Sequence, residues 1–180
     1  MERVARVIVA ERYGTSGDVL NHKEVREKTT ELALYKPGFF EELRGYSEIV
    51  ITGGDPFVVE EKMLRYFVKE LKRQNRNRKI GICTTCLRAD EYEKILNFVD
   101  SLTVIVRPDV TDDEIYDLKC MSENLNGSML YLRLFIDKSI YKKYDLRNIQ
   151  FSTWDVVKKI KWEVGYELKS KDDLYNLILD

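Results

Sequence analysis

Short apolar runs alternate along the chain with segments in which apolar residues recur every three or four positions. Five of the runs are dominated by β-branched and other apolar residues, which is typical of strands buried on both faces. A sixth run alternates strictly between apolar and polar residues and predicts a half-exposed strand at a sheet edge. The six expected strands are Val4–Ala10, Glu48–Thr52, Lys79–Cys83, Leu102–Val106, Met129–Ile136 and Lys161–Leu168.

Helical patterns separate these runs. Apolar residues from Met63 to Leu71 fall on one face of a helix. Thr111 and Glu114 have the spacing of a capping box, which predicts a helix starting after Thr111. Further helices are expected over Lys23–Tyr35, Phe39–Leu43 and Glu91–Val99. A short helix capped by Ser152 is expected to contain Val156, Val157 and Ile160. A final helix capped by Ser170 is expected to turn Leu174, Leu177 and Ile178 inward.

Strands that alternate with helices predict an α/β fold with mostly parallel strands, because parallel neighbours need crossover connections. The chain has 180 residues, whereas a closed eight-stranded barrel usually needs about 250. We therefore expect one domain over residues 1–180, an open partial (β/α)6 barrel that is TIM-barrel-like. A doubly wound sheet is the structural alternative.

Composition narrows the classes of partner. Lys and Arg number 30 against 31 Asp and Glu, so the net charge gives no sign of a nucleic-acid patch or of attraction to an anionic membrane. The basic run Lys72–Lys79 is interpreted as a solvated helix end. The sequence has no apolar stretch of membrane-spanning length and no secretion signal, and its three cysteines fit a reducing compartment, so we expect a cytoplasmic location. Abundant charge and only two glutamines favour a thermophilic source.

The second run ends in Gly53, Gly54, Asp55 and Pro56. Ligands of α/β proteins bind at the carboxyl ends of the strands. Glycines there allow close approach to bare main chain, and Asp55 can accept bonds from an ammonium or hydroxyl group. The alternative is a plain turn in which Asp55 caps the following helix.

This run resembles the Gly-Gly-Glu-Pro motif of the radical S-adenosylmethionine (radical SAM) superfamily, some members of which read Gly-Gly-Asp-Pro. The resemblance implies a six-unit partial barrel and a turn after the second strand that binds the amino group of the methionine moiety. It also implies a ligand, S-adenosylmethionine or a related nucleotide, lined by the loop after the first strand. In that loop stand Tyr13, Thr15, Ser16 and Asp18.

The cysteines depart from the superfamily. Its [4Fe–4S] cluster needs Cys-x3-Cys-x2-Cys in the loop after the first strand, and residues 11–21 contain no cysteine. The sequence therefore does not favour a [4Fe–4S] cluster. Cys83 and Cys86 have a spacing that suits a metal or a redox dithiol, while Cys120 lies in an expected helix and is interpreted as a small buried residue.

Other polar residues are weaker candidates. The lone histidine, His22, is either a surface residue or a base partnered by Asp18. Arg133 interrupts an apolar run, so it either forms a structural ion pair or faces a polar cavity. The acids at strand ends could converge on a divalent cation; these are Glu11, Asp55, Asp109 and Asp137.

Three functions follow from these residues. The first is a radical SAM-like domain without its cluster, which binds a small molecule as a binding or regulatory module. The second is a non-radical enzyme that uses the strand-end acids with a metal or as acid and base. The third is a radical enzyme with an atypical cluster on Cys83 and Cys86. Whether the chain is an enzyme, and whether a protein partner covers the open edge of the barrel, stays open.

Overall fold

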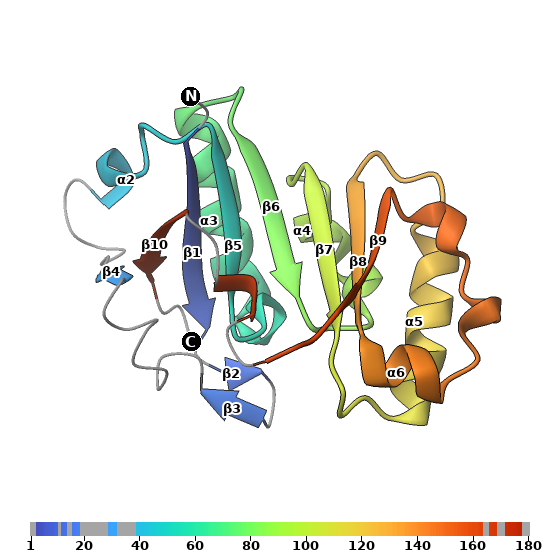
Figure 1. Cartoon of the computed structure of the whole chain (residues 1–180). Helices are drawn as coiled ribbons and strands as arrows, with labels where there is room; N and C mark the ends of the chain where they lie inside the picture. The colour runs from blue at the N-terminus through green and yellow to red at the C-terminus, as the bar shows by residue number, and fades with distance from the viewer. Residues whose placement is uncertain are drawn as a thin grey trace.

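A parallel β-sheet forms the centre of the molecule in the computed structural model (Figure 1). The structure describes residues 3–10, 12–13, 16–18, 29–31, 39–163, 166–168 and 172–177. In this part of the chain the sheet has 8 strands. Their order across the sheet is β4 (Thr29–Glu31), β10 (Asp173–Asn176), β1 (Val4–Ala10), β5 (Glu48–Gly53), β6 (Lys79–Thr84), β7 (Ser101–Val106), β8 (Tyr131–Asp137) and β9 (Val156–Ile160).

Every pairing in this sheet is parallel. From β1 to β9 the neighbours follow one another in chain order, apart from the short segments between β1 and β5. The five apolar runs of the sequence form β1, β5, β6, β7 and β8, as predicted. The α/β class and the parallel sheet are thus confirmed, and the sheet does not close on itself in the described residues.

The helices pack on one face of the sheet, called here the helix face. In Figure 1, α3, α4 and α5 lie behind the strands. Leu64, Phe67, Val68 and Leu71 of α3 join inward side chains of the strands in one continuous core. The described helices are α2 (Phe39–Glu42), α3 (Glu61–Gln74), α4 (Glu93–Leu96), α5 (Asp112–Asn124) and α6 (Lys138–Lys143), with 3₁₀ turns at Pro56–Val58, Ala89–Tyr92, Leu146–Asn148, Phe151–Thr153 and Tyr166–Leu168.

Helix α5 begins as the sequence predicts. Thr111 Oγ1 accepts a hydrogen bond from Glu114 N, and Glu114 Oε2 accepts one from Thr111 N at 2.8 Å. The capping box satisfies two amide groups that the first turn of the helix leaves without partners. The expected helix over Glu91–Val99 is shorter, since α4 follows a 3₁₀ turn.

The opposite face of the sheet, called here the interior face, carries a smaller apolar cluster. Its buried members are Val50, Cys83, Ile105 and Ile160, one from each of four strands. In the described residues, this cluster is covered by Trp162 and Tyr166 rather than by helical side chains. The described residues between β9 and β10 (161–163, 166–168 and 172) thus lie across the interior face, and we call them the crossing segment (Figure 1).

The sixth predicted strand is wrong. Lys161–Leu168 forms no strand in its described residues, and β9 is Val156–Ile160, where a short helix was expected. Ser152 lies within a 3₁₀ turn instead of capping that helix. Trp162, Tyr166 and Leu168 do not alternate because they belong to a strand. Their side chains pack inward from a connection between two strands.

The expected final helix is also wrong. Residues Asp173–Asn176 form β10, which pairs with β1 on one side and β4 on the other. The expected helix Lys23–Tyr35 is wrong at Thr29–Glu31, which forms β4. Ser170 and Ile178 of the expected final helix lie outside the described residues, and so do residues 23–28 and 32–35 of the earlier expected helix.

Arg78 corrects the interpretation of the basic run. Its side chain is 1% exposed and donates to the carbonyls of Leu43, Leu71 and Tyr46 at 2.7, 3.2 and 3.3 Å. These carbonyls lie just beyond α2 and in the last turn of α3, and two of them, those of Leu43 and Leu71, also accept a main-chain N–H. Burial lowers the pKa of this guanidinium. Arg78 is therefore a structural clamp, while Arg73, Arg76 and Lys79 of the same run are exposed as predicted.

No helix in the described part of the chain combines the length and the apolar character needed to cross a bilayer.

Candidate functional site

The Gly-Gly-Asp-Pro turn follows β5 and is held against β1. Gly53 has φ +117°, a region that favours glycine. A Cβ on Gly53 would lie 2.6 Å from the carbonyl oxygen of Ala10. Gly54 N donates a 2.7 Å hydrogen bond to that same oxygen. Both the backbone angle and the contact with β1 therefore require glycine at position 53.

Asp55 connects the turn to β6. Its carboxylate accepts hydrogen bonds from Thr84 Oγ1 at 2.6 Å, from Phe57 N at 3.1 Å and from Thr85 Oγ1 at 3.4 Å. The bond from Phe57 caps the 3₁₀ turn Pro56–Val58, whereas the sequence alternative had Asp55 capping the following helix; α3 begins later, with Glu60 at its N-cap. Burial raises the pKa of Asp55, although these hydrogen bonds and the charge of Arg107 oppose the shift. The carboxylate already has partners in the fold.

All four residues of the turn, Gly53, Gly54, Asp55 and Pro56, are buried. The sequence led us to expect bare main chain at this point. The turn instead contacts both neighbouring strands, so it is pre-organised and covered. A ligand at the carboxyl ends of the strands would contact the turn only where the residues that bury the turn leave space.

The loop expected to face the turn is described in part. It contains a short antiparallel hairpin of β2 (Arg12–Tyr13) and β3 (Ser16–Asp18), which lies beyond the carboxyl end of β1 (Figure 1). Tyr13 therefore belongs to β2, and Ser16 and Asp18 belong to β3. Thr15, Glu11 and His22 lie outside the described residues.

A row of polar residues crosses the interior face at one level. Cys83 of β6 pairs in register with Thr103 of β7, and Thr103 pairs with Arg133 of β8. Thr52 of β5 lies next to Cys83, since Ile51 pairs with Ile82 and the next position continues the register. Alternation of side chains places all four on the interior face. We call these four residues the interior polar row.

Arg133 lies on the interior face, which is compatible with one of the two placements considered from the sequence. Its guanidinium carbon lies 4.9 Å from the centre of the Tyr131 ring. Among the described residues, Arg133 makes no ion pair with a carboxylate, so the structural ion pair weighed from the sequence is not seen within this part of the chain. Arg6 on β1, by contrast, pairs with Asp172 at 2.7 Å.

Cys83 and Cys86 lie on different sides of the sheet. Cys83 belongs to the interior cluster, whereas Cys86 packs against the core of the helix face. Burial raises the pKa of Cys83 to about 11 and that of Cys86 to about 12. Cys120 lies in α5, and the described residues hold no group of three or more His, Cys, Asp or Glu that could bind a metal ion. These residues do not fit a [4Fe–4S] cluster.

The acids at the strand ends do not converge in the described part of the chain. Asp109 pairs with Arg107 at 3.5 Å and is half exposed. Asp137 accepts from Ser139 N at 2.8 Å, which caps α6, and from Trp162 N at 2.8 Å. Burial favours a higher pKa for Asp137, but the bonds from Ser139 and Trp162 outweigh it and lower the pKa.

The crossing segment was not anticipated from the sequence as a cover. The Asp137–Trp162 bond fixes its start at the end of β8, and the Arg6–Asp172 pair fixes its end beside β1. The side chains of Trp162 and Tyr166 then pack on the interior cluster. Large aromatic residues that alternate near the end of the chain were the signal for this cover.

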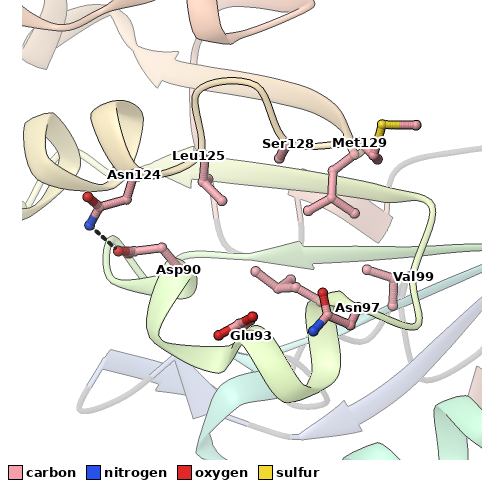
Figure 2. A pocket seen from close by; sticks show the side chains of 10 residues that line it. Asp90, Glu93, Asn97, Val99, Asn124, Leu125, Ser128 and Met129 are labelled. Carbon is pink, nitrogen blue, oxygen red and sulfur yellow. Dashed lines mark hydrogen bonds between the residues drawn. The ribbon is translucent and has the colours of Figure 1, made fainter.

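A separate cavity of about 680 Å³ opens on the helix side of the sheet (Figure 2). Its floor is apolar and its rim is polar, with a 2.7 Å hydrogen bond from Asn124 to Asp90 across one end. It lies near the amino ends of β7 and β8, away from the turn. Its lining residues are Asp90, Glu93, Leu96, Asn97, Val99, Asn124, Leu125, Ser128, Met129 and Leu130.

Comparison of the sequence with models of known protein families gives no match, and comparison with curated proteins gives no significant match.

Proposed function

We propose that this chain is a radical SAM-like partial-barrel domain that binds S-adenosylmethionine or a related nucleotide without an iron–sulfur cluster, as a binding or regulatory module. The ligand would lie on the interior face toward the carboxyl ends of the strands. The turn Gly53–Pro56, the hairpin with Tyr13, Thr15, Ser16 and Asp18, and Arg133 would surround it.

The observation that carries the proposal is the one-sided placement of the helices. A doubly wound sheet has helices on both faces, whereas the helical side chains of α3, α4, α5 and α6 join a single core on the helix face. The neighbouring strands β1, β5, β6, β7, β8 and β9 also follow chain order. A partial (β/α)6 barrel combines these two properties, and its concave side would be the interior face.

The position of the Gly-Gly-Asp-Pro turn supports the same interpretation. It follows the second long strand and is bonded to the first through Ala10 and to the third through Thr84. Since Asp55 is occupied by these bonds, an ammonium group of the ligand would find main-chain carbonyls here rather than the carboxylate. The polar residues of the interior face would contact the rest of the ligand.

Thermal unfolding with and without ligand tests the proposal. A ligand at 100 times its dissociation constant stabilises a protein by about 2.7 kcal/mol, which corresponds to a rise of roughly 5 to 10 °C for a chain of this size. We expect S-adenosylmethionine to give such a rise, with S-adenosylhomocysteine and ATP as related probes.

A matched pair of variants localises the effect. Asp18→Asn changes the hairpin assigned to the ligand, while Asp145→Asn changes an exposed acid that pairs with Arg147 far from the interior face. The rise should shrink in the first variant and persist in the second. If none of the three probes raises the melting temperature, or if Asp18→Asn responds like Asp145→Asn, the proposal is wrong.

A further inference from the structure

The cavity on the helix side of the sheet has a fixed apolar floor (Figure 2). Leu96, Val99 and Leu125 line it and are buried members of the main core, so the residues behind them hold their side chains in place. Met129 lies at the rim with a fully exposed side chain. A volume of about 680 Å³ is in the range of small-molecule sites. The floor therefore favours a ligand with an apolar body.

The charged part of the lining is acidic. Asp90 lies in the 3₁₀ turn Ala89–Tyr92, and Glu93 is the first residue of α4. Residues three positions apart in a helical segment lie on the same side, so both carboxylates border the one cavity. Asp90 accepts a hydrogen bond from Asn124 Nδ2 at 2.7 Å. Neither carboxylate forms an ion pair with another described residue.

The basic residues close to these two acids in the sequence are paired elsewhere. Arg88 pairs with Glu91, and Lys94 Nζ lies 4.0 Å from Glu61. The described residues that line the cavity include no Lys, Arg or His. The negative charge at the cavity is therefore not balanced by a cation from its own described lining.

The carboxyl end of α5 adds to this negative charge. Asn124 is the last residue of α5 and Leu125 is its C-cap, and both line the cavity. The carbonyl end of a helix carries a partial negative charge, which Lys or Arg in the last turn would offset. The last turn of α5 has no basic residue. Two carboxylates and a helix carboxyl end thus border one apolar cavity.

We propose that this cavity binds a small amphipathic cation, a molecule that carries an ammonium group on an apolar body. The body packs on the apolar floor, and the ammonium group lies beside Asp90 and Glu93. Met129 at the rim adapts to the ligand, since its side chain is long and flexible. The inference goes beyond the proposed function, because this cavity and the interior face are on opposite sides of the sheet, and the failure of one site leaves the other untouched.

Three probes with the same apolar body and different charge test the proposal on the full chain. They are phenylbutylamine, phenylbutanol and phenylbutanoate, and each is titrated at the same ionic strength. The amine gains from both the floor and the acids, the alcohol gains from the floor alone, and the acids repel the carboxylate. We expect the alcohol to bind about fivefold or more weakly than the amine, and the carboxylate to bind more weakly still.

NMR of methionine methyl groups locates the binding. The chain has four methionines, and the Met129 signal is assigned from its loss in Met129→Leu. This signal should shift saturably with the amine. Met63 is an internal control, because it lies near the start of α3 and is not among the lining residues. Its signal should not move.

Two double variants with the same change of net charge separate the site from general attraction. Asp90→Asn with Glu93→Gln keeps the shape of the lining and removes its charge, so the amine should bind about as weakly as the alcohol. The control is Asp113→Asn with Glu123→Gln, which changes two exposed acids of α5 outside the lining. This variant should bind the amine like the natural chain.

The inference is overturned if the amine does not shift the Met129 signal, or if it binds no more tightly than the alcohol. It is also overturned if the two double variants weaken the amine equally, since this would show attraction to the overall charge of the protein. The ranking of the three probes on the natural chain still decides the matter if a double variant does not fold.

Discussion

Thr84 Oγ1 donates a 2.6 Å hydrogen bond to Asp55 Oδ1, and this bond joins the turn after β5 to the end of β6. Both residues are buried. The bond gives the turn a fixed position between two strands, and it also uses an acceptor that the sequence suggested for a ligand. The carboxylate of Asp55 therefore holds the turn in place, and its Oδ1 atom is already used by the fold.

Asp55→Asn tests how this buried acid is held. Burial raises the pKa of Asp55 above its ordinary 3.8, so the folded state binds the proton more tightly than the unfolded chain. Stability from this group is fully present at low pH and falls as the pH rises toward the folded pKa. Asn keeps the Oδ1 acceptor and removes the charge.

We expect the free energy of unfolding of Asp55→Asn, relative to that of the natural chain, to increase as the pH rises above the ordinary Asp value of 3.8 and toward the folded pKa of Asp55. Urea denaturation at several pH values measures the difference. A difference that stays constant over this range would show that the Asp55 pKa is not raised in the folded state.

Gly53→Ala and Gly127→Ala separate backbone strain from steric contact. Both glycines have positive φ, +117° and +79°. A Cβ at Gly127 meets no atom within 4 Å, whereas one at Gly53 meets Ala10 O at 2.6 Å. Gly127→Ala should cost about 1 to 2 kcal/mol from the backbone alone, and Gly53→Ala should cost distinctly more. Equal losses in denaturant titrations would contradict the tight contact between the turn and β1.

Arg78→Met removes the clamp between α2 and α3. It removes three hydrogen bonds from the buried guanidinium to main-chain carbonyls, and we expect a loss of about 3 to 5 kcal/mol. Arg78→Lys should recover only part of this, because a single ammonium cannot replace a rigid fork of donors. Arg76→Met is the matched control, since Arg76 is exposed, and should change stability by less than about 0.5 kcal/mol. A small effect of Arg78→Met would place this side chain at the surface.

Asp137→Ala should release the start of the crossing segment. Asp137 accepts the main-chain N–H of Trp162 and also caps α6, so we expect a loss of about 1 to 2 kcal/mol from the cap. Hydrogen exchange at the Trp162 amide should become faster than in Asp145→Ala, in which an exposed acid is removed. Unchanged exchange at Trp162 would show that the crossing segment is held by its aromatic side chains alone.

The pH dependence of Asp137 has the opposite sign to that of Asp55. Hydrogen bonds lower its pKa in the folded state despite burial, so its stabilisation is present above the ordinary value of 3.8 and is lost as the pH falls through the folded pKa. Asp137→Ala should therefore be less sensitive to acid than the natural chain. An identical acid unfolding profile would contradict the lowered pKa.

The sequence predicts the central strands well because each is buried on both faces and forms a continuous apolar run. It fails at the edge of the sheet. Val156, Val157 and Ile160 have helical spacing, yet they form β9, in which Lys158 and Lys159 are exposed. Similarly, Leu174 and Leu177 suggest a helix, but Asp173–Asn176 pairs with β1, a strand distant in sequence. Local periodicity does not contain such long-range pairing.

The candidate site, like the fold, could be predicted from the sequence only in part. The turn at Gly53–Pro56 and the position of Arg133 in an apolar strand were visible in the sequence. The burial of the turn, the register that pairs Thr103 with both Cys83 and Arg133, and the cover formed by Trp162 depend on contacts between distant parts of the chain. Arg78 was misjudged for a related reason, since a buried arginine and its exposed neighbours look alike in a basic run.

The fluorescence of Trp162 tests the central claim most directly. The chain has two tryptophans, and Trp154 is buried on the helix face, where its Nε1 donates to Ser122 Oγ at 3.0 Å. In a Trp154→Phe variant, Trp162 over the interior face is the remaining fluorophore. We predict a saturable change in its emission as S-adenosylmethionine is added. Emission that stays constant with S-adenosylmethionine, S-adenosylhomocysteine and ATP, in a variant shown to be folded, would contradict a ligand on the interior face.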